Sequence, residues 1–273
     1  MTLSDFRSSA EPASTPPFYR AVGDEVDVFR AAARRGLPVL LKGPTGCGKT
    51  RFVEAMAHEL GRELISVAGH EDMTSADLVG RFLLKGGETV WVDGPLTRAV
   101  RQGAIFYLDE IVEARQDTTV VIHPIADHRR ELPVDRLGVT LTAAPGFQLV
   151  ISYNPGYQSV LKNLKESTRQ RFVAIELGFP PAATEIEVVA HESGVDTETA
   201  RALVVLGNAI RNLDASPLRE VSSTRMLILA GGLVAEGLSL RSAVQSAVVQ
   251  VLSDDPDVVR ALGELVDAVL PAR

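Results

Sequence analysis

The sequence is poor in features that mark several broad classes of protein. Cys47 is its only cysteine, so no disulfide can form within the chain, and we expect a reducing, cytoplasmic environment. No apolar run approaches the roughly 18 residues that a membrane-spanning helix needs, so we expect no membrane insertion. Residues 1–17 are polar and lack the apolar core of a secretion signal. They are expected to form a flexible extension.

Basic residues are also not in excess. The 273-residue chain has 28 Lys and Arg against 35 Asp and Glu, a formal net charge of -7. This balance argues against general binding to nucleic acids or anionic membranes, although it leaves room for a local basic pore. With 45% hydrophobic and 23% charged residues, the chain is expected to be globular, with one large domain or two modest ones.

Short apolar segments alternate with helical patterns between residues 18 and 180. The segments expected to form strands are 38–42, 64–67, 104–108, 148–152 and 173–177. The cores of the third and fourth segments are apolar at every position, which is typical of strands buried on both faces of a parallel sheet. We therefore predict an α/β domain over residues 18–180.

The composition changes at residues 178–181, which read GFPP. From there onwards the apolar spacing is helical and no segment has the character of a strand. One helix is marked by Leu203, Leu206, Ile210 and Leu213, with Asp196 as its N-cap. Later helices are expected over residues 223–236, 239–252 and 257–270. We predict a small all-helical domain over residues 181–273, joined through a double-proline hinge.

Two stretches do not fit simple strand–helix units. Residues 82–92 resemble a hairpin that turns at Lys85-Gly86-Gly87. Residues 131–134 and 139–141 flank a second turn and suggest another hairpin. From the pattern alone, the ordinary interpretation of each hairpin is surface decoration.

A phosphate-binding loop is the most complete motif of the chain. Residues 43–50 read GPTGCGKT and match GxxxxGK[ST] between a predicted strand and a predicted helix. Glycines let backbone N–H groups turn toward phosphates, and the helix N-terminus adds partial positive charge. We expect Lys49 to reach the β- and γ-phosphates of ATP and the Thr50 hydroxyl to bind Mg²⁺. The predicted nucleotide-binding residues are Gly43, Pro44, Thr45, Gly46, Cys47, Gly48, Lys49 and Thr50, together with Asp109.

Two acids and an amide complete the expected chemistry. Asp109 ends the strand at 104–108 and would hold Mg²⁺, partly through water, while Glu110 would deprotonate the attacking water. Asn154 follows the next buried strand and would position the same water or contact the γ-phosphate. In isolation, Asn154 would be a turn residue before Pro155. A base beside the metal-binding acid favours ATP hydrolysis over transfer of the phosphoryl group to a second substrate.

Together these motifs resemble the AAA+ ATPases of the MoxR group, in the branch of CbbQ, NorQ, NirQ and, more distantly, GvpN. The similar stretches are GPTGCGKT, DLVGR at 77–81, WVDGPL at 91–96, YLDEIVEARQDTT at 107–119, SYNPGYQ at 152–158 and STRQRF at 167–172. The resemblance covers nearly everything after residue 18. It implies a parallel five-stranded sheet between helices, two hairpin inserts facing the pore of a hexameric ring, and a helical lid domain.

The resemblance also gives two arginines roles that composition does not. Arg171 matches the arginine-finger region, which would reach into the site of the neighbouring subunit; Arg169, two residues away, is the alternative. Arg225, in Ser223-Thr224-Arg225, resembles the sensor-2 arginine and would contact the nucleotide phosphates. Without the resemblance, the ordinary interpretation of each is an exposed, solvated arginine.

The function that the resemblance implies is an ATP- and Mg²⁺-dependent motor that remodels and activates a client enzyme. Relatives of this branch work with a partner carrying a von Willebrand factor A (VWA) domain, of the NorD or CbbO type. The client would be nitric oxide reductase or, alternatively, Rubisco. Residues 84–91 and 165–171 look more similar to the NorQ/NirQ side, which favours nitric oxide reductase.

Two further alternatives come from other classes of protein. A loader-like AAA+ module bound to nucleic acid is disfavoured by the net acidity, although Lys85 and Arg136 leave some room for it. A small-molecule kinase is disfavoured by Glu110 and by the arginines expected to act in trans.

Overall fold

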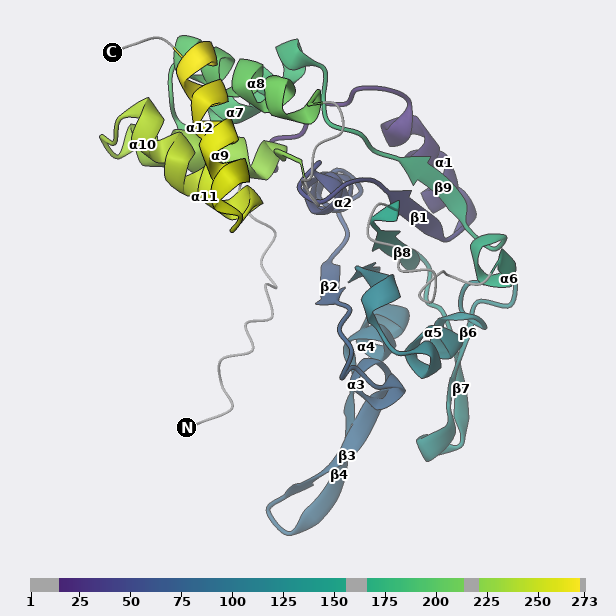
Figure 1. Ribbon diagram of the computed structural model, residues 1–273. Coiled ribbons are helices and arrows are strands. Elements are labelled where there is room, and N and C mark those ends of the chain that lie inside the picture. Colours follow the sequence, from purple (N-terminus) through teal and green to yellow (C-terminus); the bar gives the residue numbers. More distant parts are fainter. Residues whose placement is uncertain (1–14, 156–165, 214–220, 271–273) are drawn as a thin grey trace. The chain divides into compact units, whose positions relative to one another are not determined.

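The computed structural model describes residues 15–155, 166–213 and 221–270 (Figure 1). Most of the predicted N-terminal extension, residues 1–14, lies outside the described residues. The chain divides into two compact units. Of the described residues, the first contains 15–17, 24–43 and 50–176; the second contains residues 18–23, residues 44–49 and the chain from Leu177 onwards. The second unit thus combines most of the phosphate-binding loop with the C-terminal helices. The domain limits at residues 17 and 180 stay predictions.

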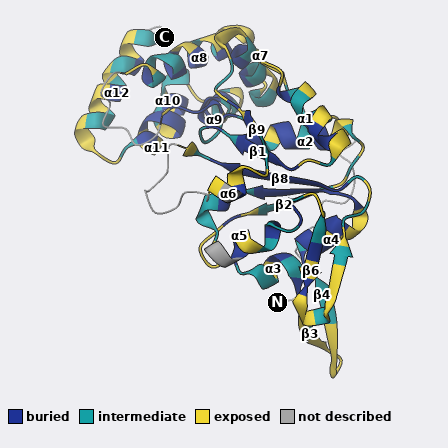
Figure 2. Cartoon of the chain, turned by 90° about the vertical axis from the view of Figure 1, so that its right-hand side faces the viewer, coloured by how far each residue is buried: buried dark blue, intermediate teal, exposed yellow. Residues whose placement is uncertain are grey.

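Five parallel strands form the main sheet of the first unit. In the order β2-β5-β8-β1-β9, they are Leu64–Ala68, Ile105–Asp109, Gln148–Tyr153, Val39–Lys42 and Val173–Glu176. All five predicted strands are confirmed. Strand β8 is buried at every position (Figure 2). Strand β5 is buried at every position except Asp109. Burial on both faces explains the continuous apolar stretches within these two strands.

The first unit also contains α-helices before and between its strands. They are α1 (Glu25–Arg35), α2 (Lys49–Glu59), α3 (Ser75–Val79), α4 (Pro95–Gln102), α5 (Gln116–Ile122) and α6 (Glu166–Arg169). In α2 the residues Phe52, Val53 and Met56, whose spacing puts them on one helical face, are buried. The Phe52 ring meets Phe29 of α1 edge to face, with ring centroids 5.5 Å apart.

Both predicted hairpins are present. The first pairs β3 (Gly80–Lys85) with β4 (Glu88–Asp93), and it projects from the rest of the first unit (Figure 1). The second pairs β6 (Glu131–Val134) with β7 (Val139–Thr142) across a 3₁₀ turn. Gly86 and Gly87 turn the first hairpin with φ of 60° and 88°, a conformation that costs a glycine little.

The described residues after Leu177 form helices with a core of their own, as predicted. The helices are α7 (Ala182–Ser193), α8 (Thr197–Arg211), α9 (Thr224–Ala235), α10 (Leu240–Val244), α11 (Gln250–Leu252) and α12 (Pro256–Val269). Asp196 caps α8 by accepting from the Thr199 N–H at 2.8 Å, which confirms that prediction. Leu213 was wrongly expected inside this helix: it lies beyond the end of α8 and is 41% exposed.

The helix predicted over residues 239–252 is interrupted by one turn of π-helix. The π turn spans Gln245–Val249 and joins α10 to α11. Its residues Ala247, Val248 and Val249 are buried, so the wider turn still faces the core. No helix among the described residues is long and apolar enough to cross a bilayer.

Candidate functional site

The carboxyl ends of three neighbouring strands gather predicted site residues at one edge of the sheet. Strand β8 lies between β1 and β5. The Gly43 N–H, just after β1, donates to the carbonyl of Tyr153 at 3.4 Å, so Gly43 lies beside Asn154. Asp109 is the last residue of β5. Open parallel α/β sheets bind their ligands at this edge.

The Asp109 carboxylate lies in a group of hydroxyls. Tyr107 donates to its Oδ1 at 2.8 Å, and the Ser152 hydroxyl donates to the same oxygen. The Glu110 N–H adds a third donor at 3.1 Å. The other oxygen, Oδ2, lies 3.4 Å from the Thr50 hydroxyl. The structure therefore brings together the two residues predicted to bind Mg²⁺, which prefers such oxygen ligands.

Tyr107 and Ser152 were missed from the sequence. Both are completely buried. Burial, together with the Asp109 charge, raises the pKa of Tyr107, so its phenol stays protonated and keeps donating. The available signal was the spacing: side chains two residues apart on a strand share a face, which puts Tyr107 on the same side as Asp109. Ser152 was visible as a hydroxyl in an otherwise apolar strand.

Glu110 has an exposed side chain and an unusual backbone. Its φ of 51° and ψ of 46° lie in the left-handed region, which non-glycine residues seldom adopt and which concentrates at functional sites. Gly69 packs against this backbone: its N–H donates to the Asp109 carbonyl at 2.7 Å, and a Cβ there would lie 2.6 Å from the Glu110 oxygen. The backbone that presents Glu110 is therefore tightly enclosed.

The phosphate-binding loop has the glycines its shape requires. Gly46 and Gly48 have φ of 70° and 103°. The Lys49 side chain is largely buried, and its Nζ donates to the Pro44 carbonyl at 2.9 Å. Cys47 is buried as well, and its burial raises the pKa of the thiol. These residues can offer N–H groups and one ammonium to a phosphate.

The start of α9 packs directly on this loop within the second unit. A Cβ placed on Gly46 would come within 2.7 Å of the Ser223 Cβ and Oγ and 3.2 Å of the Arg225 Cβ. Only a glycine fits this close approach. The Arg225 side chain is exposed. The structure thus brings Arg225, expected near the phosphates, next to the loop.

Arg171 lies elsewhere in the first unit. It is exposed and follows α6, which ends at Arg169. Two residues later, the Val173 N–H donates to the Pro38 carbonyl, where β9 and β1 both begin. Arg171 is therefore near the amino ends of the strands, at the opposite edge from Asp109. The structure does not bring it to the Asp109 of its own chain.

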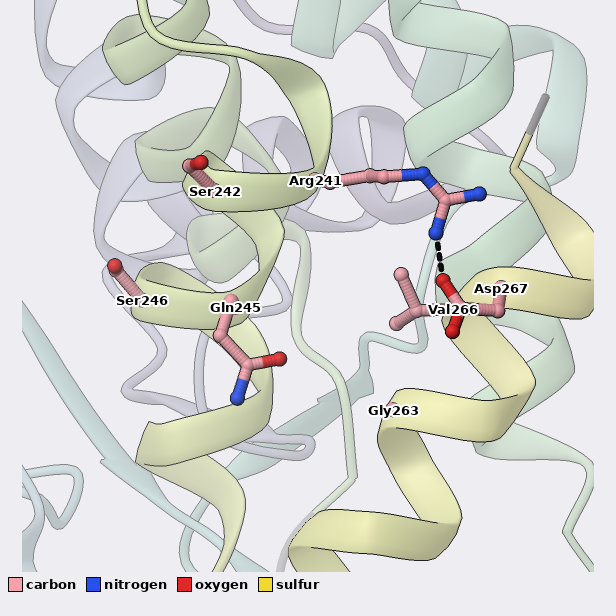
Figure 3. Close-up of a pocket in the computed structure, with 7 residues that line it drawn as sticks. All are labelled: Arg241, Ser242, Gln245, Ser246, Gly263, Val266 and Asp267. Atoms are coloured by element: carbon pink, nitrogen blue, oxygen red, sulfur yellow. Dashed lines mark ion pairs between the residues drawn. The ribbon is translucent and has the colours of Figure 1, made fainter. Parts of the chain in front are cut away.

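A pocket in the second unit is separate from the loop. It lies between α10 with its π turn and α12, where Arg241 forms an ion pair with Asp267 (Figure 3). Its lining residues are Arg241, Ser242, Gln245, Ser246, Gly263, Val266 and Asp267. None belongs to the phosphate-binding loop or to residues 222–225, so this pocket is not the predicted nucleotide site.

Two family profiles and several relatives match the chain. The AAA domain of the dynein-related subfamily matches residues 38–172, and the CbbQ/NirQ/NorQ C-terminal domain matches residues 185–269. Protein NorQ of Paracoccus denitrificans is 59% identical, over 93% of this chain and 94% of that protein. The denitrification regulatory protein NirQ of Pseudomonas aeruginosa is 57% identical, over 92% and 96%. Protein CbbQ of Hydrogenophilus thermoluteolus is 57% identical, over 90% and 92%.

Solved structures share the fold. A RuvB mutant of Thermotoga maritima has a TM-score of 0.55 and 18% identity, over 89% of this chain and 69% of that chain. A putative ATPase from Cytophaga hutchinsonii has a TM-score of 0.52 and 17% identity, over 89% and 81%. The predicted AAA+ fold is thereby confirmed. With both domain profiles matched and three relatives more than half identical over nearly their full length, the chain belongs to the CbbQ/NirQ/NorQ family of AAA+ ATPases.

Proposed function

We propose that this protein is a Mg²⁺-dependent ATPase that acts as a ring-shaped motor on a client enzyme in the cytoplasm. The observation that carries the proposal is the pairing of Thr50 with Asp109 Oδ2 at 3.4 Å, with the exposed Glu110 next in sequence. In this arrangement Thr50 supplies a hydroxyl for the metal, Asp109 supplies a carboxylate for the metal, and Glu110 beside them supplies a base. Family membership supports the same activity.

Each residue of the site has one proposed task. When bound, Mg²⁺ would neutralise charge on the β- and γ-phosphates. Thr50 and Asp109 would hold the metal, the latter partly through water. Lys49 exchanges its bond to the Pro44 carbonyl for a phosphate oxygen. Glu110 takes the proton of the attacking water, and Asn154 orients that water.

Arg171 is proposed to act on the nucleotide of a neighbouring subunit. Its place at the amino edge of its own sheet supports a role in trans, because Asp109 lies at the carboxyl edge. An arginine supplied in trans stabilises charge on the transferring phosphoryl group. We propose a homo-oligomeric, hexameric ring, in which each active site is completed by the next chain. Arg225 would contact the phosphates from within the same chain.

The hairpin of β3 and β4 is proposed to contact the client. Its side chains include exposed apolar groups: Leu84 is 76% exposed, Phe82 44% and Val90 40%. Phe82 and Leu84 are two residues apart on β3 and share one face of the hairpin, and adjoining exposed apolar side chains on a projecting element favour a protein-binding surface. Hydrolysis at the subunit interface would then move this hairpin against the bound client.

We propose nitric oxide reductase as the client, reached together with a VWA-domain partner of the NorD type. The relative named denitrification regulatory protein NirQ, at 57% identity, supports a task in denitrification. Protein NorQ, at 59%, belongs to the branch that the sequence resembles. The CbbQ relative, at 57%, makes Rubisco with a CbbO-type partner the second candidate.

Reconstitution distinguishes the two clients. The protein and ATP would be mixed with each VWA partner and its client, inactive nitric oxide reductase or inhibited Rubisco. We expect activity to return to nitric oxide reductase and to require hydrolysable ATP. Activation of Rubisco alone would transfer the proposal to the second client, and activation of neither would contradict the motor function.

A further inference from the structure

A buried ionic network lies behind the segment that carries Arg225. Glu185 of α7 is completely buried, and the side chain of Arg211 at the end of α8 is 10% exposed. Arg211 donates to both carboxylate oxygens, at 2.8 and 2.7 Å. The Thr224 hydroxyl of α9 donates to the same carboxylate at 2.6 Å. One carboxylate thus ties three helices of the second unit together.

The Arg211 guanidinium also holds the backbone of the same segment. Its Nε donates to the Ser222 carbonyl at 2.6 Å, and one Nη donates to Asn208 at 3.3 Å. The Phe179 ring lies under it, 4.0 Å from the guanidinium carbon to the ring centroid. All three guanidinium nitrogens of Arg211 therefore donate hydrogen bonds, and these bonds fix the orientation of the guanidinium group.

The other side of the segment meets the phosphate-binding loop. Ser223 and Arg225 are the residues that leave no room for a side chain at Gly46. Ser223 also caps α9 by accepting from the Met226 N–H at 3.3 Å. Residues 222–225 are thus fixed between the Glu185–Arg211 pair and the loop. A shift of the pair would be passed to both the loop and Arg225.

The stability of the second unit does not by itself require a buried ion pair between Glu185 and Arg211. Removing a carboxylate and a guanidinium from water is costly, and apolar residues of similar volume often stabilise a core as well. A bidentate ion pair does fix the relative orientation of its two side chains, because a planar guanidinium can form two hydrogen bonds to one carboxylate in only a few geometries. We propose that Glu185 and Arg211 are positioning residues for nucleotide binding: they hold residues 222–225 against the loop so that Arg225 meets the phosphates. The inference rests on the proposed ATPase function.

Two conservative substitutions test the positioning role of Glu185 and Arg211. Arg211→Lys keeps the charge but cannot bind Glu185 and Ser222 together, and Thr224→Val removes one hydroxyl from the carboxylate. For each variant we expect the Kd of fluorescently labelled ADP and the KM for ATP to rise about tenfold. This change corresponds to the loss of roughly one charge-assisted hydrogen bond. The kcat at saturating ATP should stay within about threefold of the wild type, since the base and the metal site are untouched.

Thr97→Val is the matched control for a purely structural effect. Thr97 is also buried, and its hydroxyl donates to the Val79 carbonyl at 2.6 Å in the first unit. We expect it to lower the melting temperature and leave the Kd unchanged. If Thr224→Val melts as a folded protein and binds labelled ADP like the wild type, the positioning role is wrong, even where Arg211→Lys fails to fold. If wild-type protein binds no nucleotide, the ATPase proposal and the positioning role both fall.

Discussion

The Tyr107 hydroxyl donates to Asp109 Oδ1 at 2.8 Å from a side chain that has no exposure to solvent. The Ser152 hydroxyl and the Glu110 N–H share this oxygen. Because Oδ1 is engaged by three donors, Oδ2 is the oxygen left facing Thr50. The Tyr107 phenol, two residues before Asp109, thus helps to determine that Oδ2 is the carboxylate oxygen available to a metal.

Removing this phenol should weaken metal binding. Tyr107→Phe keeps the buried ring and deletes one hydrogen bond to a charged group, which is worth about 1.5–3 kcal/mol. Because Asp109 is then held less firmly with Oδ2 toward Thr50, we expect the Mg²⁺ concentration for half-maximal ATP hydrolysis to rise about tenfold. Tyr153→Phe, a buried tyrosine on the adjacent strand, serves as control and should keep its Mg²⁺ requirement. Equal Mg²⁺ titrations for the wild type and Tyr107→Phe would exclude the role of the phenol.

The arginine proposed to act in trans can be tested by mixing chains. Arg171→Ala should bind ATP and lose hydrolysis by about 10³-fold or more. Lys49→Ala should fail to bind it. Mixed rings contain interfaces with an intact Lys49 on one side and an intact Arg171 on the other, so mixing should restore part of the activity.

No recovery at any mixing ratio would contradict the assignment in trans. Arg169→Ala, measured beside it, decides between the two arginines. Both side chains are exposed, so neither substitution should disturb the core. Loss of hydrolysis in Arg169→Ala alone would transfer the role to that residue.

The β3–β4 hairpin should couple hydrolysis to the client. Leu84→Ser removes the most exposed apolar side chain of the hairpin and should leave the unfolding temperature and the basal ATPase rate unchanged. Client activation should fall strongly, since the apolar contact is lost. Leu238→Ser, at a 42% exposed leucine of the second unit, is the matched control. Full client activation by Leu84→Ser would show that the tip of the hairpin is not the working surface.

Cys47 provides a pH-dependent measurement on the loop itself. Because the thiolate is the reactive form and burial raises the pKa of Cys47, little thiolate is present near neutral pH. Iodoacetamide should label the folded protein slowly at pH 7.5, and the rate should keep rising above about pH 8.5, the pKa of an ordinary cysteine. As the only cysteine, Cys47 accounts for all labelling. A rate equal to that of the unfolded chain at pH 7.5 would contradict a buried, protonated thiol.

Much of the fold could be predicted because local pattern decides it. The strands around Tyr107 and Val150 are buried on both faces, so every residue must be apolar or internally hydrogen-bonded. The Gly86-Gly87 turn and the Asp196 cap depend on neighbours in sequence. The π turn at Gln245–Val249 was not visible, because its apolar residues also fit a regular α-helix.

Parts of the site depend on pairings that the sequence does not show. Glu185 and Arg211 are 26 residues apart, and each alone resembles a charged helix residue exposed to solvent. Ser152 and Tyr107 meet only because β8 and β5 are neighbours in the sheet. The role of Arg171 depends on a second chain, so neither the sequence pattern nor a single chain defines its contacts.

Phosphate release from ATP by the wild type and by Glu110→Gln tests the central claim most directly. We expect the wild type to hydrolyse ATP only with Mg²⁺. Glu110→Gln should bind ATP with similar affinity and hydrolyse it about 10²–10⁴-fold more slowly, because the amide cannot take the proton of water. Glu113→Gln, in the following 3₁₀ turn, should retain activity. Equal turnover by the wild type and Glu110→Gln, or no turnover by folded wild-type protein with Mg²⁺, would contradict the account.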